Sequence, residues 1–184
     1  TMCLAGFADM GAAFYVLYAR ERVGLPPQVI GLFISAQVVG GLLSGIALGP
    51  LGDRMGASAV IRTVMVMRFL APLLALGAPL LMALFPGLAT GAFLLIFALT
   101  GVVTASYMIG SMNYLLEIAP EGERPTYVGL VNTLSGLTLV APLLAGWLVA
   151  AVSYEAVFVL AMLVGAVGLL LSLRVPHNER VAHI

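Results

Sequence analysis

Residues Leu48–Ser58 read LGPLGDRMGAS, a short polar segment in a chain that is otherwise largely apolar. Apolar runs of about 20 residues, the length of a helix that crosses a bilayer, flank it on both sides. Within Gly49–Gly56 the segment holds an aspartate, an arginine and three glycines. Glycine permits backbone angles and close approaches that other residues exclude. We therefore expect a tight turn between two membrane helices, with Asp53 beside a helix end and Arg54 at the level of the headgroups.

The composition indicates that the solvent of this chain is lipid. Of its 184 residues, 62% are hydrophobic and 9% are charged, and the mean hydropathy is +1.14. Soluble domains carry about 25% charged residues. The net charge is zero and all eight basic residues are arginine, so no basic patch for nucleic acid is expected. Cys3 is the single cysteine, so we expect neither a disulfide framework nor a metal site, and no cofactor.

Six windows are apolar and long enough to cross a bilayer, which predicts an all-α membrane protein with six transmembrane helices. They are Met2–Ala19, Val29–Leu48, Ala59–Leu80, Leu88–Leu115, Tyr127–Val152 and Ala156–Leu173. The breaks between them are mostly rich in glycine, proline and charged residues, which is typical of turns. Apolar and polar residues do not alternate along these windows, so the strands of a barrel are a poor alternative.

The placement of arginine predicts the orientation of the chain, because cytoplasmic loops carry an excess of basic residues. If the helices thread the membrane in order, only Arg20 and Arg22 lie on one side, and these two run against the bias. The more numerous arginines of the other side are Arg54, Arg62, Arg124, Arg174 and Arg180. We therefore expect both termini in the cytoplasm, in an inner or plasma membrane of the bacterial type.

The segment Gly49–Gly56 resembles the signature loop of the major facilitator superfamily, G-x-L-x-D-R-x-G, which joins the second and third helices of each six-helix half. Gly49, Asp53, Arg54 and Gly56 match this pattern. Two small residues, at positions 57 and 58, stand where the family has a basic pair. Arg62, four residues further on, is the next basic residue and would take the place of that pair.

Two further stretches resemble the same family. Residues 117–133, EIAPEGERPTYVGLVNT, are similar to its E-x-x-P-[DE]-x-x-R connection between the fourth and fifth helices of a half. The matching residues are Glu117, Pro120, Glu121 and Arg124. Residues 136–148, GLTLVAPLLAGWL, are similar to its fifth-helix pattern G-x-x-x-G-P-x-x-G-G, with Pro142 and Gly146 in place as packing residues.

The resemblance implies one half of a secondary transporter, a symporter or antiporter, that moves a small solute by alternating access. The complete fold has two six-helix halves, each built from two three-helix inverted repeats, with the substrate between the halves. We expect 1–184 to be one six-helix domain, with repeats at 1–83 and 88–173 and a polar cytoplasmic tail at 174–184. The short tail favours the C-terminal half. The expected partners are the lipid bilayer, a small-molecule substrate and the other half, from the same chain or from a second copy.

Charges inside the predicted spans are the candidates for function. A charge there costs roughly 2.5–3.5 kcal/mol on insertion scales, so it needs a partner, water or a role. Asp9 in the first span and Arg68 in the third lie at similar depth, about 10–13 Å from the same end of their helices. We expect either that the two pair or that Asp9 binds a proton or a cationic substrate. The alternative is an interfacial Asp9 with an Arg68 that snorkels to the surface.

Other candidates follow from the resemblance and from residue size. The first and fourth helices of a family half line the cavity, which implies Tyr15, Tyr107 and Asn113 as substrate contacts. Gly41 and Gly45 stand four residues apart in the second span, a spacing that lets another helix approach closely. That contact is either a sliding surface for the other half or static packing.

Other classes of function compete with the transporter. The chain has no H-E-x-x-H and no G-x-S-x-G motif, so an intramembrane enzyme is not expected. A self-contained six-helix protein that works as a homodimeric carrier or channel stays open, as does a non-transporting membrane scaffold. An isolated half is not expected to transport by alternating access.

Overall fold

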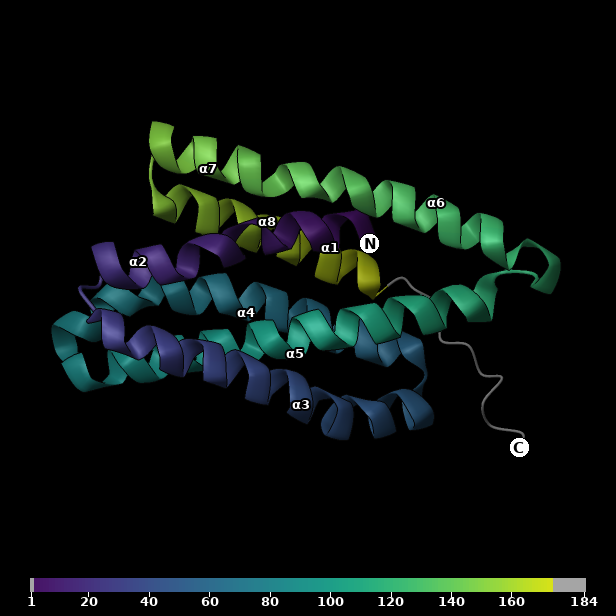
Figure 1. Ribbon diagram of the computed structural model, residues 1–184, viewed down its shortest axis with the longest axis horizontal. Helices are drawn as coiled ribbons and strands as arrows, with labels where there is room; N and C mark the ends of the chain where they lie inside the picture. Colours follow the sequence, from purple (N-terminus) through teal and green to yellow (C-terminus); the bar gives the residue numbers. More distant parts are fainter. Residues whose placement is uncertain (1, 174–184) are drawn as a thin grey trace.

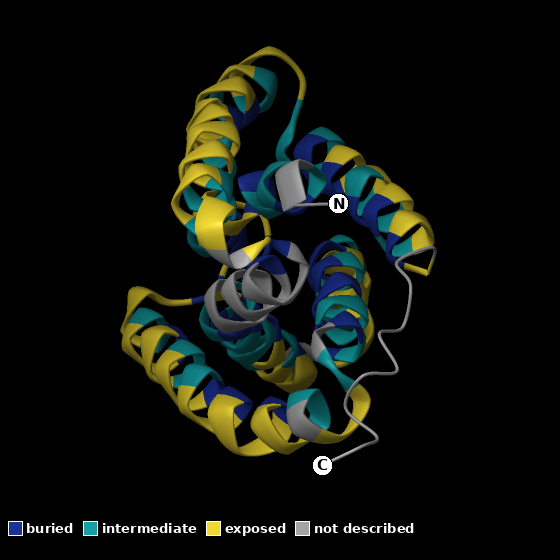
Figure 2. Ribbon diagram, turned by 90° about the vertical axis from the view of Figure 1, so that its right-hand side faces the viewer, coloured by how far each residue is buried: buried dark blue, intermediate teal, exposed yellow. Residues whose placement is uncertain are grey.

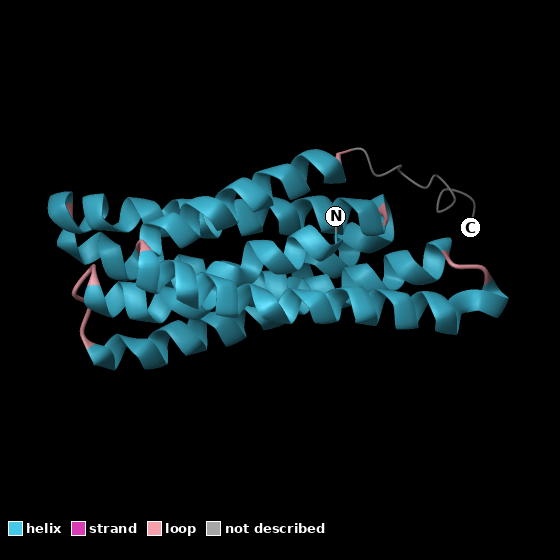
Figure 3. Ribbon diagram, turned by 90° about the horizontal axis from the view of Figure 1, so that it is seen from above, coloured by secondary structure: helices cyan, strands magenta, loops and turns pink. Residues whose placement is uncertain are grey.

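The computed structural model describes residues 2–173, a range in which nearly every residue is helical and none forms a strand (Figure 3). Within that range, some side chains are not described: those of Met2, Cys3, Asp53, Ala57, Pro86, residues 108–114, residues 116–118 and Glu121. The predicted tail at 174–184 lies outside the described residues. The all-α membrane fold is confirmed.

Six helical segments follow one another along the bundle (Figure 1). The first three are α1 (Met2–Ala8), η1 (Asp9–Phe14) and α2 (Tyr15–Glu21) in one segment, then α3 (Ile30–Met55), then α4 (Ala57–Leu84). The last three are α5 (Pro86–Ile118), then α6 (Arg124–Leu137), η4 (Thr138–Val140) and α7 (Ala141–Ala151) in one segment, then α8 (Tyr154–Ser172). Short 3₁₀ turns, η2 (Pro27–Val29) and η3 (Glu121–Glu123), lie in two of the connections.

Five of the described segments are long and apolar enough to cross a membrane, judged by length and composition. They are Pro27–Gly52, Ser58–Leu84, Gly87–Tyr107, Arg124–Ala151 and Tyr154–Ser172. The first predicted span differs, because its two α-helices of 7 residues each are separated by the 3₁₀ helix η1. This tighter stretch begins at Asp9 and contains Gly11, where an added Cβ would lie 3.2 Å from the Phe158 ring. The first segment is therefore an interrupted helix, as is common at functional hinges.

The expected turn over Gly49–Gly56 is shorter than the sequence suggested. Helix α3 continues through Gly49 and Arg54 to Met55, and α4 begins at position 57. Gly56 alone reverses the chain, with φ of 78°, and its N–H donates to the carbonyl of Gly52 at 2.8 Å. Only glycine adopts this left-handed φ without a steric cost. Arg54 is exposed at the end of α3.

The connection between α4 and α5 is also shorter than the break at 81–87 between the predicted spans, because α4 continues to Leu84 and α5 already begins at Pro86. Proline suits the first turn of a helix, where its missing N–H would have no partner. The last connection is short, as expected. There the N–H of Ala156 donates to the Ser153 hydroxyl at 3.2 Å, which caps the N-terminus of α8.

Helices α4 and α5 form the middle of the bundle. Helix α5 packs on both α3 and α4, α4 also packs on α8, and α1 packs on α8 and α6. Buried residues line the contacts between helices, whereas exposed residues cover much of their outward surfaces (Figure 2). The largest core cluster is rich in aromatic rings, including a stacked pair, Phe33 and Phe97, with centroids 5.0 Å apart.

Two glycines bring α3 and α5 into close contact. A Cβ on Gly40 would overlap the carbonyl oxygen of Ala98, and a Cβ on Gly101 would overlap that of Gln37. Gly41 lies on the same side of α3, where its Cβ would be 3.6 Å from the Gly101 oxygen. Gly45 differs, because an added Cβ there would meet nothing within 4 Å.

Arg62 of α4 contacts the end of α8. Its Nε donates to the carbonyl oxygen of Ser172, with 3.3 Å between the two atoms. The last carbonyls of a helix have no partner inside the helix and carry partial negative charge, so a cation is favoured there.

We expect Arg62→Ala to lower the free energy of unfolding by about 1 kcal/mol, because it removes both the hydrogen bond and the charge at this helix end. Denaturation with SDS in mixed micelles, followed by circular dichroism, measures the change. Arg62→Lys keeps the charge and is expected to lose less than the alanine variant. Equal losses in the two variants would mean that the charge contributes nothing.

Candidate functional site

The two charges inside the predicted spans pair with each other. Arg68 donates from Nε to Oδ1 of Asp9 at 2.9 Å and from Nη2 to Oδ2 at 2.7 Å. This two-bond geometry is the strongest form of an arginine–carboxylate contact. The expected pairing is confirmed. Arg68 does not snorkel to the surface, because its side chain is 2% exposed.

The pair links the interruption of the first segment to α4. Asp9 is the first residue of η1, and Arg68 lies well inside α4. The side chain of Asp9 is 41% exposed, unlike that of Arg68. The carboxylate therefore has an accessible side, whereas the guanidinium is enclosed. A buried charge without a partner is strongly destabilising, so Asp9 compensates the charge that α4 carries into the bundle.

Tyr107 of α5 provides the second contact of the arginine. The Cζ atom of Arg68 lies 4.4 Å from the centroid of the Tyr107 ring, a cation–π geometry. Nη1 of Arg68 and Oγ of the adjacent Ser106 are buried, and neither has a hydrogen-bond partner among the described residues. Buried polar atoms in native proteins usually bind a protein group or an ordered water. The site thus joins the first, third and fourth helical segments.

Tyr15 lies in the aromatic core. It is 3% exposed, and its ring stacks on Phe158 with centroids 5.1 Å apart. Phe97 contacts it edge-on at 6.5 Å. Its environment in the structure is that of a packing residue.

None of the other residues singled out in the sequence has a described contact with the ion pair. The side chains of Asp53, Asn113, Glu117 and Glu121 lie outside the described part of the structure. Pro120 precedes η3 and Arg124 begins α6, in the connection that follows α5. Pro142 is exposed in the first turn of α7. An added Cβ at Gly146 would lie 3.7 Å from the ring of Phe14, so this glycine packs against the first segment.

A second polar cluster fixes the end of α2 to the start of α8. The Tyr154 hydroxyl donates to Oε2 of Glu21 at 2.7 Å, and Nε of Arg22 lies 3.6 Å from Oε1 of Glu155. The sequence did not predict this cluster or the contact of Tyr107 with Arg68. A charge-rich helix end was visible in RERVG, but its partners lie about 130 residues further along the chain. Among the described residues, no three histidine, cysteine, aspartate or glutamate side chains are grouped as metal ligands would be.

The fold and this site define an all-helical membrane protein that holds an ion pair between its helices. The family model of the Major Facilitator Superfamily matches residues 1–183, and the chain belongs to this family of membrane transporters. No curated protein and no solved structure matches the chain.

Proposed function

We propose that this chain is one six-helix half of a secondary transporter, which carries a small solute by alternating access against a second half. Membership of the family supports the class of transporter. The observation that carries the proposal further is the Asp9–Arg68 pair at the interrupted first segment. Substrate and ion sites in secondary transporters lie near the membrane midplane, where helices are discontinuous.

In this proposal, Asp9 meets the solute or the coupling ion, and Arg68 is a positioning residue. The exposed side of the carboxylate is available to a cation, a proton or a hydrogen-bond donor. The ring of Tyr107, on α5, contacts the guanidinium of Arg68, so the arginine stays in position when Asp9 binds a ligand. An intramembrane acidic residue with such a partner is a common element of proton and ion pathways.

Helix packing supports a division into two three-helix repeats, at 1–83 and 88–173. If each of the first three segments is matched with its counterpart among the last three, the α1 segment corresponds to α5, α3 to α6–α7, and α4 to α8. Under this correspondence the observed α1–α8 contact is equivalent to the observed α5–α4 contact. The α1–α6 contact is likewise equivalent to the α5–α3 contact, and the α4–α8 contact is equivalent to itself. A pseudo-twofold relation of this kind is expected of inverted repeats.

We further propose that the second half packs on the exposed faces of α3 and of α6–α7. These helices lie at opposite edges of the bundle (Figure 1). Their outward residues are large and apolar, and the most exposed are Leu42, Ile46, Leu139, Leu143 and Trp147. Gly45 and Gly49 also have open space at their α carbons, which suits a close helix contact. The chain is proposed as the C-terminal half, with both termini in the cytoplasm of a bacterial-type inner or plasma membrane.

We expect Asp9→Asn to reduce solute uptake at least tenfold. The test uses the full natural polypeptide in vesicles with an imposed proton gradient, screened with labelled small solutes, and the solute that the wild type accumulates is followed in the variants. Asp9→Glu, which keeps the charge, is expected to retain part of the uptake, and Tyr107→Phe, which keeps the ring, most of it. Glu21→Gln is the matched control, because it removes a carboxylate of the same segment outside the site.

Rates are normalised to folded protein in the vesicles, so that a loss of stability is not counted as a loss of transport. Uptake by Asp9→Asn within twofold of the wild type would contradict the role of Asp9. Uptake by a stable monomer of these 184 residues alone would contradict the proposal that the chain is a half.

A further inference from the structure

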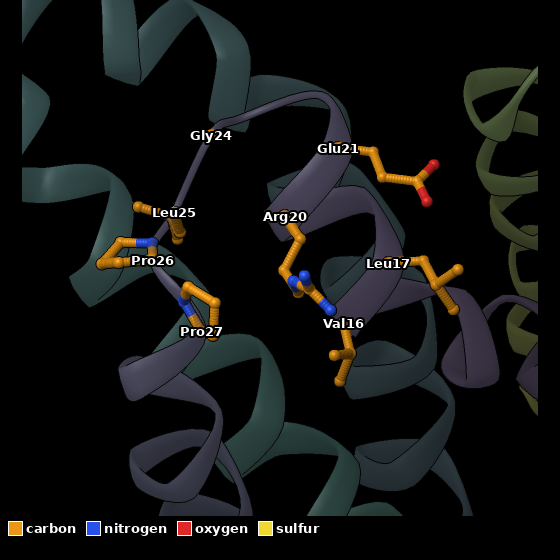
Figure 4. Close-up of a pocket in the computed structure, with 8 residues that line it drawn as sticks. All are labelled: Val16, Leu17, Arg20, Glu21, Gly24, Leu25, Pro26 and Pro27. Carbon is orange, nitrogen blue, oxygen red and sulfur yellow. The ribbon is translucent and has the colours of Figure 1, made fainter.

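Two interrupted segments of the bundle lie side by side at their interruptions. The first segment tightens into η1 at Asp9, and the fifth segment, which comprises α6, η4 and α7, tightens into η4 at Thr138. Helix α1 contacts α6 and η4, and η1 contacts α7. The far end of the first segment differs, because α2 there borders an open depression that Arg20 lines and that no residue of η4 or α7 lines (Figure 4). The fifth segment therefore supports the part of the first segment that carries Asp9.

Thr138 fills a notch that Gly6 leaves in α1. A Cβ added at Gly6 would lie 2.5 Å from Cβ and from Cγ2 of Thr138, much closer than two carbon atoms pack. Because Cβ of Thr138 is bonded directly to its backbone, it cannot swing aside. The Thr138 hydroxyl donates to the carbonyl oxygen of Ser135 at 2.6 Å, which holds the side chain in one rotamer. The contact therefore fixes the separation of the two segments, about one helical turn before Asp9.

Further contacts hold η1 along its length. Met10 lies in one core cluster with Ala141 and Ala145 of α7. At the end of η1, the ring of Phe14 lies 3.7 Å from the place of an added Cβ on Gly146. A 3₁₀ helix has poorer hydrogen-bond geometry than an α-helix, and runs longer than three or four residues are uncommon. The six residues of η1 therefore depend on packing against the fifth segment.

We propose that Thr138 is a positioning residue for Asp9. Its contact with Gly6 sets where the first segment tightens, and it thereby places the Asp9 carboxylate against the guanidinium of Arg68. The outward face of the same segment, which includes the exposed Leu139, is where the second half is proposed to pack. Movement of the second half therefore reaches Asp9 through the fifth segment. The inference rests on the proposed function for the role of Asp9 in transport, whereas the positioning itself is measured without transport.

The test measures the energetic coupling between Asp9 and Arg68 in the full natural polypeptide. SDS titration of the wild type, Asp9→Ala, Arg68→Met and the double variant gives this coupling as their departure from additivity. The same four proteins are then made with Gly6→Ala, which forces α1 away from Thr138. We expect the coupling to fall to less than half of its wild-type value. A merely structural contact would destabilise all four proteins alike and leave the coupling unchanged.

Two further backgrounds keep the test decisive if Gly6→Ala folds poorly. Thr138→Gly empties the notch without any overlap and is expected to lower the coupling as well. Gly6→Ala with Thr138→Gly exchanges the small and the large side of the contact, and we expect it to restore most of the coupling. Gly77→Ala on α4 is the matched control, because its Cβ meets nothing within 4 Å. Wild-type coupling in both single backgrounds would overturn the proposal, and so would a loss that the exchanged pair does not restore.

A second arm measures vesicle uptake of the labelled solute that the wild type accumulates. We expect Gly6→Ala to reduce uptake at least fivefold, and Thr138→Val, which keeps the branched shape and lacks the hydroxyl, to stay within twofold of the wild type. A loss in Thr138→Val as large as in Gly6→Ala would overturn the assignment, because the hydroxyl itself would then act in transport. Full uptake by Gly6→Ala with a reduced coupling would instead contradict the transport role of Asp9, as full uptake by Asp9→Asn would.

Discussion

Asp9→Ala is expected to lower the free energy of unfolding by about 3 kcal/mol, because it leaves a buried charge without its counterion. The guanidinium of Arg68 stays enclosed, with its side chain 2% exposed, and keeps only the ring of Tyr107 as a described partner. Titration of the purified chain with SDS in mixed micelles, followed by circular dichroism, gives the free energy of unfolding.

The control for this experiment is the double variant Asp9→Ala with Arg68→Met. It removes both charges and fills the site with an apolar side chain, and replacement of a whole buried pair is often neutral. We expect the double variant to recover most of the stability lost in Asp9→Ala, a non-additive result that identifies the pair as one unit. A double variant at least as unstable as the sum of the two single changes would show that the charges do not depend on each other.

Gly101→Val is expected to lower the free energy of unfolding by about 3 kcal/mol, through overpacking of the α3–α5 contact. The new Cβ would overlap the carbonyl oxygen of Gln37, and helix backbone cannot move aside as a flexible side chain can. The two helices must separate, which also exposes the Gly40 contact with Ala98. The same SDS titration measures the loss.

Two matched controls lie on the same two helices. Gly91→Val on α5 and Gly45→Val on α3 make the same chemical change at positions where an added Cβ meets nothing within 4 Å. In the isolated chain, without the second half proposed to pack near Gly45, each is expected to change the stability by less than about 0.5 kcal/mol, as is usual for surface substitutions. If all three variants lose the same stability, the loss does not come from the α3–α5 contact.

The sequence by itself determined that the chain folds in a lipid bilayer, where its helices lie and where most of its turns fall. These properties are local: about 20 consecutive apolar residues require a membrane, and glycine or proline ends a helix wherever it occurs at the end of such a run. Gly56 and Gly24 reverse the chain near where their residue type predicted a turn. The sequence also identified the family through the residues around Asp53 and Arg54, and the family model confirms it over residues 1–183.

Only the tertiary structure decided which face of each helix is inside. In water, an apolar stripe marks the buried face, but lipid and protein interior are both apolar, so hydropathy does not distinguish them. The sequence therefore could not select Gly40 over Gly45 as the buried contact, or place Tyr15 in the core.

The ion pair shows the same limit. Depth along the helices made a contact between Asp9 and Arg68 feasible, yet these residues are 59 positions apart. The rotation of α4 about its own axis determines whether the arginine meets the aspartate or the lipid. That rotation is fixed by packing against α5 and α8, and the same packing places Tyr107 over the guanidinium.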